Sequence, residues 1–193
     1  HGHTDLAAFS RYWVHNGFVT VEGEKMSKSL GNFTTAQDLL NKEIPGETIR
    51  FALLSAHYRQ PLDWSNKGIE QAQKSLDKFY KILDDLKNVP DIKADVPAAF
   101  FDALLDDLNS PKAYAELNAL AKAAQEHKSP ESKAAFKSAA NLMGLLTADP
   151  QDWLSTAHKP AAAIDAAWVE GLLTERTEAK NAKNFARADA IRD

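Results

Sequence analysis

The sequence predicts a mainly α-helical protein, with one short strand and a lysine-rich loop near its start and an antiparallel helix bundle over the rest. The first observation is an apolar stripe with the three- and four-residue spacing of a helix face, formed by Ile69, Ala72, Leu76, Phe79, Leu83 and Leu86. The second is a set of helix start signals at Ser65, at Asn109 or Ser110, and at Ser129. The third is the alternating stretch GFVTVEGE, residues 17–24, which predicts the strand.

The residues before the bundle predict short elements in a fixed order. Apolar residues at near-helical spacing predict a helix over 5–15, and the strand of 17–24 follows with Gly23 as its turn. The segment EGEKMSKSLGN, residues 22–32, has neither helical nor strand periodicity and predicts a loop. Helical spacing returns from Thr35 and predicts two short helices, separated by a break at 44–46 that contains a proline.

The rest of the chain predicts a series of helices packed against one another. The longest covers 66–86, and the proline-containing stretch 89–97 predicts an irregular connection. Further helices are expected over 101–108, from the restart at 109–111, after 129–130, over 164–172 and from 184 onward, with a turn around 148–150.

Composition narrows the class of protein. The 193 residues are 44% hydrophobic, enough for a real core, and they contain no apolar run long enough for a membrane span and no signal-peptide pattern. Without cysteine the chain has no disulfide framework and no thiolate metal ligand, so we expect no metal site within it. The net charge of −4 argues against a generally basic nucleic-acid coat. The cytoplasm is the expected location.

The loop carries the clearest chemical signal. Lys25 and Lys28 are flexible point charges, and Ser27 and Ser29 place hydroxyls beside them, an arrangement that suits a polyphosphate. Such donors matter most when they follow the charge that develops on a leaving group. Taken alone, the spacing is more typical of a charged loop that is simply solvated.

The amino-acid sequence of the loop also resembles that of a known protein family. KMSKS, residues 25–29, followed by LGN, resembles the second signature of class I aminoacyl-tRNA synthetases. RYWVHNGFVTVEGEKMSKSLGNF, TIRFALLSAHYRQPLDWS, LDDLNSPKAYAEL and KNAKNFARADAIRD resemble, in this order, segments of cysteinyl-tRNA synthetases. The resemblance covers essentially the whole chain. By comparison with the family, we expect the chain to begin after the HIGH motif and the zinc ligands and to stop within the anticodon-binding region.

The resemblance implies a ligase that condenses cysteine with ATP, with Mg²⁺, to cysteinyl adenylate and then transfers the cysteinyl group to tRNA(Cys). Lys28 would bind ATP and stabilise the departing pyrophosphate, and Lys25 would support the same phosphates less directly. Ser27 and Ser29 would hold the loop or bind phosphate, and Val19 would lie where such folds place adenine. The family's zinc is expected in the full-length protein, and the isolated chain is expected to be inactive and monomeric.

The resemblance also implies three parts. Residues 1–33 would end a Rossmann catalytic domain, 34–65 would form a stem-contact linker, and 66–193 would form an anticodon-binding bundle of the DALR type. Arg59, Lys180, Lys183 and Arg187 are candidate tRNA contacts, although a solvated arginine and a salt-bridged exposed helix explain them equally well. Two other functions stay open: the paralogous ligase that joins cysteine to an aminated sugar-inositol in mycothiol synthesis, and a non-catalytic helical module that binds tRNA or another protein.

Overall fold

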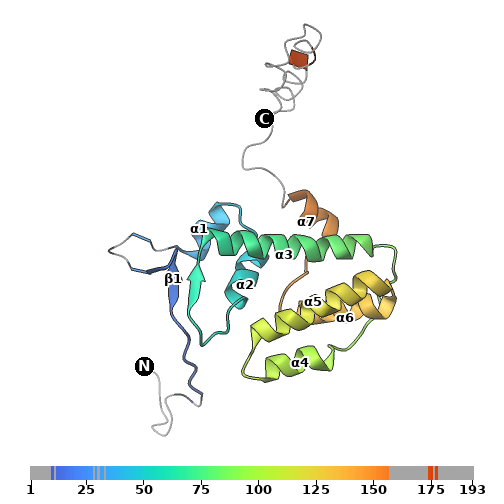
Figure 1. Cartoon of the computed structure of the whole chain (residues 1–193), viewed down its shortest axis with the longest axis horizontal. Coiled ribbons are helices and arrows are strands. Elements are labelled where there is room, and N and C mark those ends of the chain that lie inside the picture. Colours follow the sequence, from blue (N-terminus) through green and yellow to red (C-terminus); the bar gives the residue numbers. More distant parts are fainter. Residues whose placement is uncertain are drawn as a thin grey trace. The chain divides into compact units, whose positions relative to one another are not determined.

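The computed structural model describes residues 10, 12–27, 29, 31–32, 34–156, 174–175 and 177. The chain divides into two compact units, residues 1–154 and 155–193, and the architecture below is that of the first. It is mainly helical, as the sequence predicts, with one small sheet (Figure 1). None of the helices in the described ranges combines the length and the apolar character that a membrane crossing requires.

The sheet has three short strands in the order β2-β1-β3. Strand β1, Val19–Val21, pairs antiparallel with β2, Glu24–Lys25, and parallel with β3, Leu62–Trp64. The predicted strand is confirmed at Val19–Val21, and its turn places Gly23 at φ +80°, a conformation that glycine adopts without strain. Strand β2 was not predicted, and it includes Lys25, which the sequence assigned to the loop. Strand β3 was not predicted, because a three-residue strand is too short to show an alternating pattern.

The helix predicted over 5–15 is wrong for its described residues, since positions 10 and 12–18 form no helix. The Gly17 amide donates to the carbonyl of Tyr58 over 2.7 Å, and the carbonyl of Phe18 accepts from the Leu62 amide over 2.9 Å. These bonds draw the chain into an extended course beside the segment that leads into β3. Tertiary pairing therefore overrides the local spacing of apolar residues.

Two short helices follow the loop, as predicted. Helix α1, Ala36–Asn41, begins at Thr35, whose hydroxyl accepts from the Asp38 amide in a capping box. Helix α2, Gly46–Leu54, begins after Pro45. Both turn an apolar side inward, because Leu39, Phe51 and Ala52 are buried.

Helix α3, Asn66–Asp85, is the longest described element and confirms the predicted stripe. Ser65 caps its start by accepting a hydrogen bond from the Gly68 amide. The inward face carries Ala72, Leu76, Phe79 and Leu83, all buried, while lysines occupy the outward face. Figure 1 shows α3 running along the body beside α2 and above α5.

The bundle is completed by α4, Ala98–Leu105, α5, Ser110–His127, and α6, Pro130–Leu142. Asn109 and Ser129 cap α5 and α6, as their sequence signals predict. The core between these helices is fully buried at Phe100, Leu117 and Phe136, and the ring of Phe136 meets that of Phe79 edge-on at 5.5 Å. The antiparallel packing follows from the short connections between successive helices.

Helix α7, Pro150–Thr156, was not predicted, because only a turn is indicated around 148–150. Its Trp153 is buried, stacks on Tyr80 of α3 at 4.5 Å and donates to Asp77 over 2.9 Å. This contact closes the α3 side of the bundle. The helices predicted over 164–172 and from 184 onward lie outside the described residues.

Candidate functional site

The lysine loop follows directly from the hairpin of β1 and β2. The hairpin turn is held by Asp63 of β3, which accepts from the Thr20 hydroxyl and the Gly23 amide, each over 2.8 Å. The Gly23 amide, and then the Thr20 hydroxyl, keep the pKa of Asp63 below its usual value. An ionised carboxylate on β3 therefore fixes the turn that leads into the loop.

A second carboxylate joins the hairpin to α3. Glu22 accepts a hydrogen bond from the Asn66 amide over 2.8 Å, at the first residue of that helix. The free amides of a helix start carry partial positive charge, so a carboxylate is favoured there. The Glu22 amide also donates to the carbonyl of Trp64 over 3.1 Å. Hydrogen bonds thus connect the start of the loop to the start of α3.

The loop itself is closed by one side chain. The Asn32 carbonyl oxygen accepts from the Ser27 amide over 2.9 Å, and its amide nitrogen donates to the carbonyl of Lys25 over 3.1 Å. Gly31, beside it, has a φ of +66°, which a residue with a side chain adopts only at a cost. Asn32 therefore holds Lys25 and Ser27 together across the base of the loop.

An apolar hollow of about 150 Å³ lies beneath this base. It is lined by Val19, Met26, Thr34, Ala36, Leu39, Ile49, Leu53 and Trp64. Met26 thus sits between the two ends of the loop and the helices α1 and α2. Its apolar side chain contacts this hollow, while Lys25 and Ser29 of the same loop are exposed.

The structure brings four of the predicted site residues together. Lys25, on β2, is exposed, and the hydroxyl oxygens of Ser27 and Ser29 lie 3.2 Å apart. Val19 lies on β1, 41% exposed, with its side chain on the apolar hollow. Lys28 lies outside the described residues. Hydroxyls and a lysine on one short loop can donate several hydrogen bonds to a single anion.

The described residues include no group of three or more histidines and carboxylates that could hold a metal ion. Two carboxylates beside the loop, those of Asp63 and Glu22, are engaged with backbone amides. No residue of this set is therefore assigned to the zinc or the Mg²⁺ that the family resemblance implies.

Arg59, a predicted tRNA contact, is bound to the bundle. Its guanidinium donates to both carboxylate oxygens of Asp107, over 2.7 and 3.2 Å, and the Tyr58 hydroxyl donates to the same group over 2.6 Å. The Arg59 guanidinium, and then the Tyr58 hydroxyl, hold the pKa of Asp107 below its usual value. Arg59 thus links the segment after α2 to the turn before α5. Lys180, Lys183 and Arg187 lie outside the described residues.

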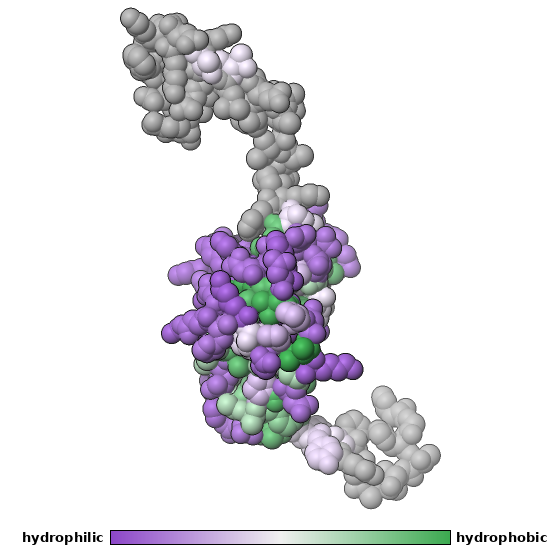
Figure 2. Space-filling model, turned by 90° about the vertical axis from the view of Figure 1, so that its right-hand side faces the viewer, coloured by the Kyte–Doolittle hydropathy of each residue, from purple (hydrophilic) through white to green (hydrophobic). Residues whose placement is uncertain are grey.

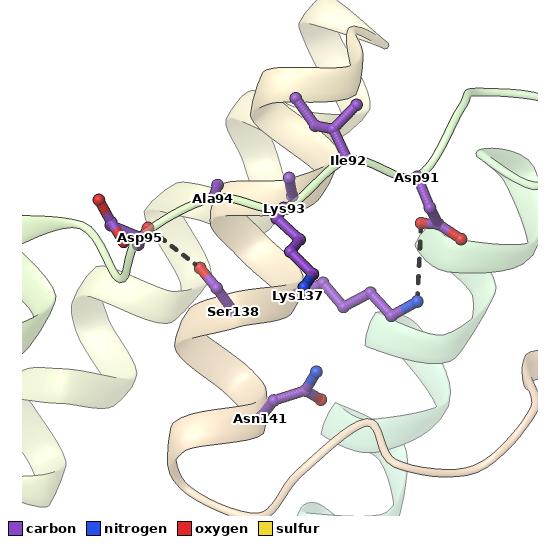
Figure 3. A pocket seen from close by; sticks show the side chains of 9 residues that line it. Asp91, Ile92, Lys93, Ala94, Asp95, Lys137, Ser138 and Asn141 are labelled. Carbon is purple, nitrogen blue, oxygen red and sulfur yellow. Dashed lines mark hydrogen bonds and ion pairs between the residues drawn. The ribbon is translucent and has the colours of Figure 1, made fainter.

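A larger hollow, of about 580 Å³, lies between the connection at 91–95 and α6, far along the chain from the loop (Figure 3). Three of its polar side chains have partners: Lys137 forms an ion pair with Asp91 at 3.6 Å, and the Ser138 hydroxyl donates to the carbonyl of Asp95. The nearly buried Lys133 donates to the carbonyl of Val89 over 2.6 Å and pairs with Asp91. These contacts fasten the connection to α6.

Three residues that shape the site were not singled out from the sequence. Asn32 could have been found, because it ends the LGN extension of the motif and an asparagine beside glycine is typical of a structured turn. Asp63 and Glu22 carry no such signal. Their roles depend on the pairing of β1 with β3, which brings together residues about 40 positions apart.

Two protein-family models match parts of the chain. Residues 2–74 match the family described as tRNA synthetases class I (C) catalytic domain, and residues 99–148 match the DALR domain. The first match contains the loop, the sheet and both short helices. The second contains α5 and α6 and most of α4.

Curated relatives agree with both matches. A cysteine–tRNA ligase of Rhodospirillum rubrum is 48% identical over 189 residues, and one of Parvibaculum lavamentivorans is 49% identical over 199 residues. These alignments cover 96% and 100% of this chain and 41% of each relative. A cysteine–tRNA ligase of Rickettsia felis is 44% identical, over 97% of this chain and 40% of the relative. The chain is therefore similar over nearly its whole length to cysteine–tRNA ligases, with a class I catalytic-domain match at its start, and it spans about two fifths of the length of the curated relatives it matches.

Proposed function

We propose that the chain is part of a cysteine–tRNA ligase, which activates cysteine with ATP to cysteinyl adenylate and transfers the cysteinyl group to tRNA(Cys). The observation that carries this proposal is a KMSKS loop closed by Asn32, in a chain whose relatives are named cysteine–tRNA ligases. Those names favour the ligase over the mycothiol-pathway paralogue. The working enzyme is proposed to be a cytoplasmic monomer.

In this proposal the three predicted parts have separate tasks. Residues 1–33 supply the end of the catalytic domain with the loop, 34–65 form the stem-contact linker, and 66–193 form the anticodon-binding bundle. The loop binds the phosphates of ATP through Lys28, Lys25 and the hydroxyls of Ser27 and Ser29. Val19 is proposed to lie beside the adenine.

The loop promotes adenylation by charge and position. As the cysteine carboxylate attacks the α-phosphate of ATP, negative charge grows on the leaving pyrophosphate, and a lysine ammonium beside it stabilises that charge most in the transition state. Asn32 and Met26 hold the base of the loop, and the bond from Asn32 to the Lys25 carbonyl keeps Lys25 at that base. Mg²⁺ would neutralise the phosphates when bound, and zinc is proposed to belong to the full-length protein.

The transfer step needs a bound tRNA. Arg59, Lys180, Lys183 and Arg187 are proposed to contact its phosphates. Arg59 is 55% exposed beside Asp107, so it could offer its free edge to a phosphate without leaving the carboxylate.

The adenylation role is tested by the substitution Lys28→Ala in a full-length ligase that contains this 193-residue sequence. Pyrophosphate exchange at saturating ATP and cysteine should fall by about 10²- to 10³-fold, because the lost donor acts on developing charge. Lys42→Ala, an exposed lysine just after α1, is the matched control and should leave the rate unchanged. Equal exchange rates in wild type and Lys28→Ala would overturn the proposed role of the loop.

A further inference from the structure

Helix α3 carries a row of four lysines along its solvent side, which we call the lysine stripe: Lys67, Lys74, Lys78 and Lys81. All four side chains are exposed. With 3.6 residues per turn, the four positions fall within about 60° of one another around the helix axis and extend over about 21 Å of its length. They lie opposite the buried face that includes Leu76 and Phe79.

The lysine stripe has no carboxylate within 4.0 Å in the part of the chain that the structure describes. Two of the helix's four acidic residues are engaged elsewhere, since Asp77 accepts from Trp153 and Gln73 and Asp84 pairs with Lys87 at 3.4 Å. Glu70 and Asp85 are exposed beside the stripe. Four cations therefore face two carboxylates along this side, in a chain whose net charge is −4.

The stripe has the character of a polyanion contact rather than of a protein interface. Protein interfaces depend on a few large apolar or aromatic anchors, and α3 exposes none among its described residues. A single small anion would use one end of the row only. A chain of phosphates can engage all four charges, because it follows the helix for its whole length. Figure 2 shows the body in a view turned by 90° from that of Figure 1, with hydrophilic residues surrounding an apolar area on this face.

We propose that the lysine stripe binds the sugar–phosphate backbone of the tRNA, a proposal that rests on the proposed function. The start of α3 is bound to the hairpin through Asn66 and Glu22, and its middle is bound to α7 through Asp77 and Trp153. Phosphates held along α3 are therefore positioned relative to the hairpin that leads into the KMSKS loop. The contact is electrostatic and independent of base sequence.

The test compares two triple variants of the 193-residue chain that lose the same charge. Lys74→Gln, Lys78→Gln and Lys81→Gln remove most of the stripe. Lys87→Gln, Lys112→Gln and Lys122→Gln remove three exposed lysines that each face a carboxylate, at 3.4, 3.8 and 3.8 Å. The dissociation constant of fluorescently labelled tRNA(Cys) transcript is measured by anisotropy at several salt concentrations, after circular dichroism has shown equal helix content.

The stripe variant should bind at least about tenfold more weakly at low salt, and its slope of log affinity against log salt should be shallower by about 2, because three phosphate contacts are lost. The control variant should change the slope by less than half as much. Equal losses in the two variants would overturn the stripe as a contact surface, and so would tight binding by the stripe variant. Failure of the wild-type chain to bind tRNA would also overturn it, whereas the adenylation test on Lys28 would still decide the function of the loop.

Discussion

The KMSKS loop and the helix bundle are stabilised by different kinds of interaction. In the bundle, Phe79 and Phe136 are 1% and 0% exposed, and their burial contributes free energy over a large apolar area. Among the residues of the loop that the structure describes, the base is held by two hydrogen bonds of Asn32 and by the side chain of Met26. Segments held by few contacts open at a small cost in free energy, whereas a packed core opens only when the domain unfolds. The proposed function, in which the loop closes over a nucleotide and then releases it, requires a segment that opens at a small cost in free energy.

The two regions are joined by a partly buried polar network. Glu47 of α2 accepts from the Tyr80 hydroxyl of α3 over 2.7 Å and from the Leu146 amide, after α6, over 2.6 Å. Burial, and then the bond to Glu47, raise the pKa of Tyr80, so its hydroxyl remains a donor at neutral pH. The Tyr114 hydroxyl of α5 donates to the carbonyl of Phe51 in α2 over 3.1 Å. Helix α2, which borders the loop hollow, is thus fastened to the bundle by directional bonds.

The largest change in the free energy of unfolding is expected from a substitution in the core of the bundle, away from the loop. Phe79→Ala should lower the free energy of unfolding by about 3–5 kcal/mol, because it leaves a cavity against Phe51 and Phe136. Guanidinium unfolding followed by circular dichroism measures the change. Phe101→Ala, the same substitution at a side chain that is 44% exposed, should cost less than about 1 kcal/mol. Similar losses in both variants would contradict the packing described for α3.

A smaller effect is expected where the sheet meets the extended chain. At Gly17 a Cβ atom would overlap the carbonyl oxygen of Gln60, so Gly17→Ala must push the two segments apart, which should cost about 1–3 kcal/mol of stability. Hydrogen exchange of the Leu62 amide, which donates to Phe18, should become faster while the amides of α5 keep their protection. Gly46→Ala is the control, since a Cβ atom there meets nothing within 4 Å. Unchanged exchange at Leu62 would show that this pairing does not limit the opening of the sheet.

The smallest effect on stability is expected in the loop. Asn32→Ala removes two hydrogen bonds, each contributing about 0.5–1.5 kcal/mol to local order, and should leave the unfolding of the bundle unchanged. The rate of limited proteolysis between residues 24 and 34 should rise. Asn32→Asp keeps an acceptor for the Ser27 amide but loses the donor to Lys25, so its rate should lie between those of wild type and Asn32→Ala. Asn88→Ala, at an exposed site outside the loop, is the control, and its proteolysis rate should equal that of wild type. If Asn32→Ala is also cleaved at the wild-type rate, Asn32 does not hold the loop closed.

The sequence by itself determined helices α3, α5 and α6 and the identity of the loop, whereas α4 covers Ala98–Leu105 and thus begins and ends three residues before the predicted 101–108. The stripe from Ile69 to Leu86 and the caps at Ser65, Asn109 and Ser129 are local patterns, and a helix is stabilised largely by residues within a few positions of one another. The KMSKS letters identify a family signature without any knowledge of the fold.

Only the tertiary structure decided the course of residues 10–18, the existence of β3 and α7, and the carboxylates that hold the hairpin. The spacing that predicted a helix over 5–15 failed because Gly17 and Phe18 bond to Tyr58 and Leu62. Asp63 reaches Thr20 across 43 positions of sequence through the parallel pairing of β1 and β3. Hydrogen bonds of this kind depend on which distant segment lies alongside, and a strand of three residues carries too short a pattern to specify its neighbour.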